Sequence, residues 1–176
     1  GIAYRLAERY DLDALTAGAI SLCAFLLATP FQVLFTPAGS KEEFIVGGAI
    51  PTALMGSKGL FVAIVIALFS TEVYRWIVKR NIVISLPESV PPAVSKSFVA
   101  LIPGFVVVTI VWIVRLLLEM TTFESIHNVI GIILGKPLGM LGGSLIGSII
   151  AYSIIMLLWS AGLHGTNIVN GVMQPI

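Results

Sequence analysis

The sequence predicts an all-α, polytopic integral membrane protein. Of its 176 residues, 57% are hydrophobic and only 11% are charged, and the mean hydropathy is +1.03. A soluble globular domain carries about 25% charged residues. Two stretches, residues 14–40 and 137–176, contain no Asp, Glu, Lys or Arg. We expect about four spanning helices, each needing about 20 mostly apolar residues, one interfacial amphipathic helix and the start of a re-entrant or broken helix.

The same composition excludes several classes of function. Ten basic and nine acidic side chains give a net charge of +1, so the chain lacks the positive charge that a nucleic-acid partner requires. A single cysteine, Cys23, excludes an intrachain disulfide and a cysteine-based metal cluster. We therefore expect no metal site, no cofactor and no nucleic-acid partner. The chain starts at Gly1 without a Met or a secretory signal, and we expect it to be a piece of a longer protein.

Residues 1–80 are expected to hold the first two membrane spans and an external loop between them. The first span is predicted over residues 12–35 and the second over residues 59–78. Between them, residues 41–58 combine a charged Lys-Glu-Glu run with glycines and a proline, which disfavour regular structure.

Residues 81–97 are expected to form a cytoplasmic, proline-rich linker. Pro87, Pro91 and Pro92 occur there among serines and charged residues, and proline disfavours helical geometry in the residue before it. The third span is predicted over residues 98–120.

Residues 121–136 have the pattern of a short amphipathic helix that lies at the membrane interface. Thr121 and Glu124 fit the capping-box pattern for its start. Isoleucines fall on one face, and Glu124, His127 and Asn128 fall on the other. Residues 137–176 are expected to hold the fourth span and a re-entrant segment.

Three further local patterns lead to predictions. Glycines recur every fourth residue at Gly139, Gly143 and Gly147, which favours close helix packing over a ligand role. Two ion pairs, Glu72–Arg75 and Arg115–Glu119, are predicted because residues three or four apart are neighbours on a helix. An excess of Lys and Arg before the first span and within residues 79–96 places those two regions in the cytoplasm.

The most informative segment is residues 159–171, which holds three glycines, one histidine and two asparagines inside an uncharged run. Non-helical backbone at membrane depth persists only where protein buries it or a water-filled cavity borders it, and transporters use such breaks to build substrate sites. We predict that the substrate site contains Trp159, His164, Gly165, Asn167 and Asn170. A buried structural histidine is the alternative interpretation of His164, and a structural role is as plausible as a functional one for each asparagine.

Several motifs resemble one family of bacterial sugar permeases. The segment Asn81-Ile82-Val83-Ile84-Ser85-Leu86-Pro87-Glu88-Ser89-Val90-Pro91-Pro92 is similar to the linker of the enzyme IIC subunits of the phosphotransferase system, in the lactose, cellobiose and diacetylchitobiose branch. Phe123-Glu124-Ser125-Ile126-His127-Asn128, Lys136-Pro137-Leu138 and the Gly-Leu-His-Gly around His164 follow in the family's order.

The resemblance implies a function. Such a subunit binds and moves a β-linked disaccharide in the bacterial plasma membrane, usually as a homodimer. A separate phosphorylated IIB protein carries the phosphoryl group, so no catalytic residue is expected in this chain. His164 is expected to hydrogen-bond the sugar, together with a glutamate in a later Asn-Glu-Pro motif that this sequence does not contain.

Three other functions remain open from the residues alone. A proton-coupled secondary transporter would use His164 as its protonatable group. An intramembrane hydrolase would need a nucleophile such as Ser144, but no acid lies near it in sequence to complete a triad. A pure assembly subunit would leave the histidine in a glycine-broken segment unexplained.

Overall fold

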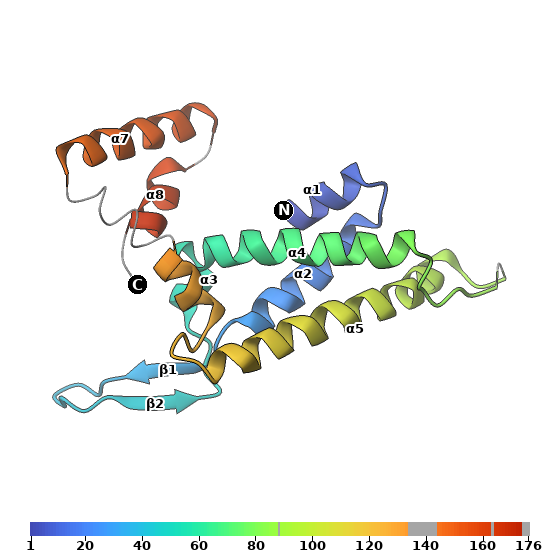
Figure 1. Cartoon of the computed structure of the whole chain (residues 1–176), viewed down its shortest axis with the longest axis horizontal. Coiled ribbons are helices and arrows are strands. Elements are labelled where there is room, and N and C mark those ends of the chain that lie inside the picture. The colour runs from blue at the N-terminus through green and yellow to red at the C-terminus, as the bar shows by residue number, and fades with distance from the viewer. Residues whose placement is uncertain (88, 134–143, 163, 174–176) are drawn as a thin grey trace. The chain divides into compact units, whose positions relative to one another are not determined.

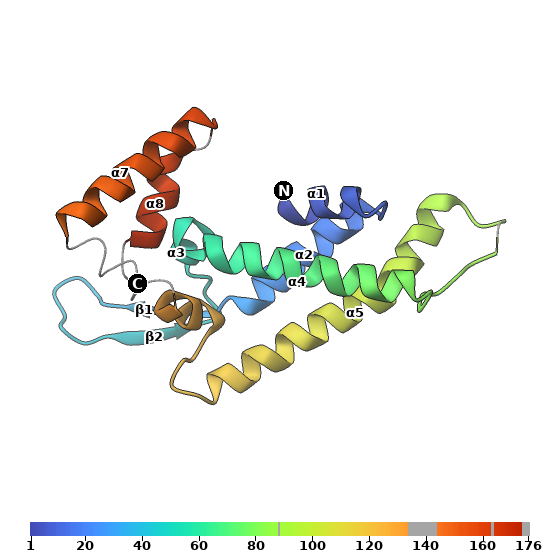
Figure 2. The same ribbon diagram turned by 45° about the horizontal axis from the view of Figure 1, so that its top comes forward.

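The computed structural model describes residues 1–87, 89–133, 144–162 and 164–173, and this part of the chain is mostly helical (Figures 1 and 2). Its labelled elements are α1 (Ile2–Arg9), α2 (Ala14–Ala28), β1 (Gln32–Phe35), β2 (Phe44–Gly47), α3 (Thr52–Met55), the 3-10 turn η1 (Ser57–Gly59), α4 (Leu60–Lys79), α5 (Pro92–Glu119), α7 (Leu145–Ser160) and α8 (Gly165–Met173). Residues 126–133 form a further helical segment.

The chain divides into two compact units. The first unit contains Gly1–Ala28 and Ala63–Thr121, and the second contains Thr29–Val62 and Thr122–Ile176. Each unit therefore combines segments that are distant in the sequence.

The first unit is a helical cluster in which α2 packs against both α1 and α5. Alanines predominate on the buried side of α2, at Ala17, Ala24 and Ala28, and the buried residues of α5 include Val107 and Val111. The small alanine side chains allow neighbouring helix backbones to approach closely.

Two helices, α4 with 20 residues and α5 with 28, are long and apolar enough to cross a membrane. The other two predicted spans correspond to shorter helices, α2 with 15 residues and α7 with 16. At 1.5 Å per residue, a 15-residue helix is about 22 Å long, which is less than the roughly 30 Å hydrocarbon layer.

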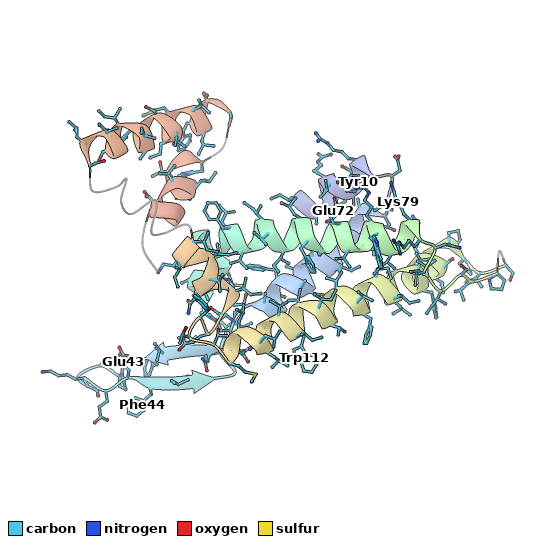
Figure 3. The ribbon with its side chains drawn as sticks, in the orientation of Figure 1. Tyr10, Glu43, Phe44, Glu72, Lys79 and Trp112 are labelled. Carbon is cyan, nitrogen blue, oxygen red and sulfur yellow. The ribbon has the colours of Figure 1, made fainter. Side chains whose placement is uncertain are left out.

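The predicted end of the first span at Phe35 is wrong, because α2 ends at Ala28. Pro30 has no amide proton and disfavours helical geometry at Thr29, which interrupts the helix. The following residues form β1, which pairs antiparallel with β2, Val33 opposite Val46 and Phe35 opposite Phe44. Residues 41–58, expected to form an irregular loop, thus include strand β2. Its first residue, Phe44, is labelled in Figure 3.

The proline-rich linker is shorter than predicted, because α5 begins at Pro92. Proline is well suited to the first position of a helix, where its missing amide proton would have no intrahelical partner. Pro103 also lies inside α5, where it is buried.

The predicted capping box is wrong. Thr121 Oγ1 donates a 2.7 Å hydrogen bond back to the carbonyl oxygen of Leu118, and Glu124 has a positive φ of 60°. The segment 126–133 is capped instead by Ser125, whose Oγ accepts a hydrogen bond of 3.2 Å from the amide of Asn128. Helix formation therefore starts four residues later than the pattern indicated.

His127 is also misplaced by the amphipathic pattern, which puts it on the polar face. The structure buries this side chain to 1% exposure. Burial lowers the pKa of His127 to about 4, so its imidazole is neutral at pH 7.

Both predicted ion pairs are confirmed. Arg75 lies 3.2 Å from Glu72, and Arg115 lies 2.7 Å from Glu119. Glu72 also accepts a hydrogen bond from the hydroxyl of Tyr10, and the Arg75 guanidinium lies 4.0 Å from the centre of the Tyr10 ring (Figure 3). This three-residue cluster joins the α1–α2 connection to α4.

Candidate functional site

The candidate site lies at the break between α7 and α8, two helices that pack against each other (Figure 1). The start of α7 is capped by Ser144, whose Oγ accepts a 3.0 Å hydrogen bond from the amide of Gly147. Residues 138–143 of the predicted fourth span, with Gly139 and Gly143, lie outside the described residues. Gly147 is buried, in keeping with a packing role.

Gly162 ends α7 by reversing the chain direction. Its φ is +77°, a backbone angle that residues with a Cβ atom rarely adopt. The amide of Gly162 donates a 3.0 Å hydrogen bond to the carbonyl oxygen of Trp159. The helix therefore breaks within the glycine-rich segment, as predicted.

Gly165 begins α8 at a point of close contact with α7. A Cβ at this position would collide with the backbone carbonyl of Ile155. Gly165 is buried, so its observed contribution to the candidate site is this close packing of the two helices.

His164 stands at the N-terminal end of α8 with an exposed side chain. Its backbone oxygen accepts a 3.1 Å hydrogen bond from the amide of Asn167, and its Nδ1 makes a longer contact of 3.4 Å with the same amide. The imidazole ring lies 4.6 Å from the Trp159 ring, centre to centre, with the planes tilted by 50°. With Nδ1 directed at the helix end, Nε2 is the nitrogen available to a ligand.

The structure brings together three of the five predicted site residues: Trp159, His164 and Asn167. Asn170 is exposed and lies three residues beyond Asn167, on the same face of α8. Among the described residues, no group of three His, Cys, Asp or Glu side chains could hold a metal ion.

Sequence reasoning missed Thr166. Its Oγ1 accepts a hydrogen bond of 3.4 Å from Nε1 of Trp159, so it helps to hold the ring that contacts His164. No local pattern predicts this pair, because the two residues are joined only when the chain reverses at Gly162.

All 176 residues match the family model described as "Phosphotransferase system, EIIC". The chain belongs to this family. The membership confirms the resemblance drawn from the linker and the histidine motif, and the family's character as an integral membrane protein agrees with the two candidate spans.

Two curated relatives place the chain more closely within the EIIC family. It is 64% identical to the lichenan permease IIC component of Bacillus subtilis over 100% of this chain and 39% of the relative. It is 62% identical to the cellobiose-specific EIIC component of Geobacillus stearothermophilus, again over 100% of this chain and 39% of the relative. The chain thus spans about two fifths of the length of the curated relatives it matches.

A solved structure has the same fold. The transporter ChbC, the IIC component of an N,N'-diacetylchitobiose-specific phosphotransferase system, is 59% identical and superposes with a TM-score of 0.76, covering 99% of this chain and 40% of ChbC.

Proposed function

We propose that this chain is part of the membrane-embedded, sugar-translocating subunit of a phosphoenolpyruvate-dependent phosphotransferase system. The complete protein would bind a β-linked disaccharide of the cellobiose, diacetylchitobiose or lactose type and present it to a phosphorylated IIB protein. The observation that carries this proposal is the exposed cluster of Trp159, His164 and Asn167 at the α7–α8 break. The names of the EIIC relatives support the class of sugar.

Each residue of the cluster offers a contact that a sugar requires. The imidazole of His164 can donate or accept a hydrogen bond from a hydroxyl group, and the amides of Asn167 and Asn170 can do both. The apolar face of Trp159 can pack against the C–H groups of a pyranose ring. A broken helix supplies these groups at membrane depth, where its unpaired backbone must border a cavity.

This chain is proposed to bind and orient the sugar and not to carry the phosphoryl group. IIB would supply that group, while Nε2 of His164 holds the hydroxyl that accepts it. We place residues 81–91 on the cytoplasmic side, within reach of IIB, because basic residues collect around them. The complete protein would then be a multi-pass protein of the bacterial plasma membrane and a homodimer, with the re-entrant segment starting in α7 and α8.

The test is equilibrium binding of cellobiose, lactose and diacetylchitobiose to the full-length protein in membranes. His164→Ala should weaken binding of the preferred sugar about five- to 150-fold, because a buried hydroxyl that loses one hydrogen-bond partner costs about 1–3 kcal/mol. Trp159→Leu should also weaken binding. Trp112→Leu is the matched control, since Trp112 is an equally exposed tryptophan on α5 (Figure 3). Unchanged affinity in His164→Ala would make this residue structural.

Proton-coupled secondary transport is the alternative, and the EIIC family match does not favour it. Uptake assays in sealed vesicles separate the two mechanisms. Phosphotransferase transport yields sugar phosphate inside and depends on the phosphoryl donor. Proton coupling would accumulate unmodified sugar in response to a pH gradient alone.

A further inference from the structure

One face of α4 changes character along its length. Its exposed positions are spaced by three or four residues and therefore form one stripe. The stripe is apolar first, then acidic, then aromatic and finally basic, in the order Val65, Leu68, Glu72, Trp76, Lys79 and, just beyond the helix, Arg80. Lys79 is the last residue of α4 and is labelled at its end in Figure 3.

Trp76 and Arg80 form a stacked pair at this end of α4. The guanidinium carbon of Arg80 lies 4.3 Å from the centre of the Trp76 ring, and Trp76 is 52% exposed. Contact with the ring leaves N–H groups of the guanidinium available for bidentate hydrogen bonds to two oxygens of an acceptor such as a phosphate.

The two terminal cations differ from the cation one turn earlier. Arg75 forms an ion pair with Glu72 and lies over Tyr10. Within the described residues, the side chains of Lys79 and Arg80 form no ion pair or hydrogen bond. Two neighbouring positive charges therefore have no carboxylate partner in the part of the chain that the structure describes.

The backbone holds these cations at the tip of the helix. Asn81 has a positive φ of 56°, and the amide of Ile82 donates a 3.2 Å hydrogen bond to the carbonyl oxygen of Ile77. This is the hydrogen-bond pattern that closes a helix C-terminus. The chain turns away immediately after Arg80, which leaves the basic end of the stripe exposed.

We propose that Trp76, Lys79 and Arg80 form a binding site for the headgroup phosphate of an anionic phospholipid. Among the described residues, α4 is one of two helices long and apolar enough to span a membrane, and tryptophans at span ends lie at the level of the lipid headgroups. Basic residues just beyond a span attract anionic lipids. An acidic protein would satisfy the cations equally well, but beyond Glu72, which is paired with Arg75, the same stripe continues as Leu68 and Val65 and offers an acyl chain an apolar surface.

Binding at this site would set the depth of α4 in the bilayer, because Trp76 and Lys79 lie in the last turn of α4 and Arg80 follows directly. The same helix carries Tyr74, which is buried near the N-terminal end of α5 and lines a small pocket with Pro92 and Lys96. The lipid site therefore lies on α4, the helix that also lines the pocket at the N-terminal end of α5.

The test is native mass spectrometry of the full-length protein titrated with phosphatidylglycerol or with phosphatidylcholine of the same acyl chains. We expect preferential retention of phosphatidylglycerol. Lys79→Gln and Arg80→Gln should each lower its apparent affinity about fivefold, the effect of one cation near a lipid surface. Arg80→Lys should weaken binding partially, because it keeps the charge and loses the stacked, bidentate geometry.

Lys41→Gln is the matched control, because it removes one exposed cation from the β1–β2 connection and leaves α4 unchanged. An equal loss in Lys41→Gln, or equal retention of phosphatidylcholine, would overturn the proposal.

Displacement of the lipid by millimolar inorganic phosphate would identify a free-anion site instead. If the Lys79 and Arg80 variants keep phosphatidylglycerol but lose sugar phosphorylation by IIB, the cations serve an acidic protein partner and the lipid site is rejected. Unchanged elution and unfolding temperature in each variant exclude misfolding as the cause.

Discussion

Nη1 of Arg115, near the end of α5, donates a hydrogen bond of 3.0 Å to the carbonyl oxygen of Leu27, in the last turn of α2. The last carbonyl groups of a helix lack intrahelical partners and carry partial negative charge. Arg115 satisfies one of them and also pairs with Glu119. This side chain therefore fixes α5 against α2 at the residue where α2 gives way to the hairpin.

Replacing Arg115 should destabilise the first unit. Arg115→Leu removes a hydrogen bond from a charged donor that is only 16% exposed, and such bonds contribute about 1.5–3 kcal/mol. We expect a lower thermal unfolding temperature for the full-length protein in detergent, by several degrees. Arg5→Leu is the control, because Arg5 forms a similar pair with Glu8 but is 81% exposed, and surface pairs contribute little. Equal effects of the two variants would contradict the capping role.

Gly165→Ala should disrupt the candidate site without touching the sugar. The added Cβ would collide with the carbonyl of Ile155 and force α8 away from α7. Overpacking of this kind costs about 1–3 kcal/mol, and we expect disaccharide affinity to fall about five- to 150-fold. Gly18→Ala is the control, because a Cβ at Gly18 meets nothing within 4 Å. Retained affinity in Gly165→Ala would show that the α7–α8 contact is not required for binding.

Ser125→Ala should cost more stability than Thr121→Ala. Ser125 is 8% exposed and caps the segment 126–133 through the amide of Asn128, and loss of an N-cap costs about 1 kcal/mol. The hydroxyl of Thr121 is exposed and bonds backward to Leu118. Thermal unfolding of the two variants, measured in one detergent, distinguishes the caps. The reverse order would support the capping box that the sequence pattern predicted.

The hydrogen bond between Tyr10 and Glu72 should make stability depend on pH in the alkaline range. The bond to the Glu72 carboxylate raises the pKa of Tyr10 above its ordinary value of 10.0. Because the folded protein favours the protonated phenol, the stabilisation is fully present below pH 10 and is lost as the pH rises through the higher, folded-state pKa. The difference in unfolding temperature between the wild type and Tyr10→Phe should therefore shrink from pH 8 to pH 11. A constant difference would show that Tyr10 contributes through packing alone.

Features that depend on near neighbours were predictable from the sequence. The ion pairs Glu72–Arg75 and Arg115–Glu119 follow from helical spacing. The break before α8 follows from the density of glycine, and the family from the order of the linker and histidine motifs. Each ion pair, the break and each family motif involve residues within one short segment of the chain.

The membrane class, the family and the break near His164 can be read from the residues alone. Three features depend on contacts made in the folded chain: the end of α2, the serine that caps residues 126–133, and the side chains around His164. The end of α2 involves Arg115, which is 88 residues away from Leu27 in the sequence, and β1 is defined by pairing with β2. Hydrogen-bond partners that come together only on folding leave no periodic signal in the sequence, so local patterns cannot reveal them.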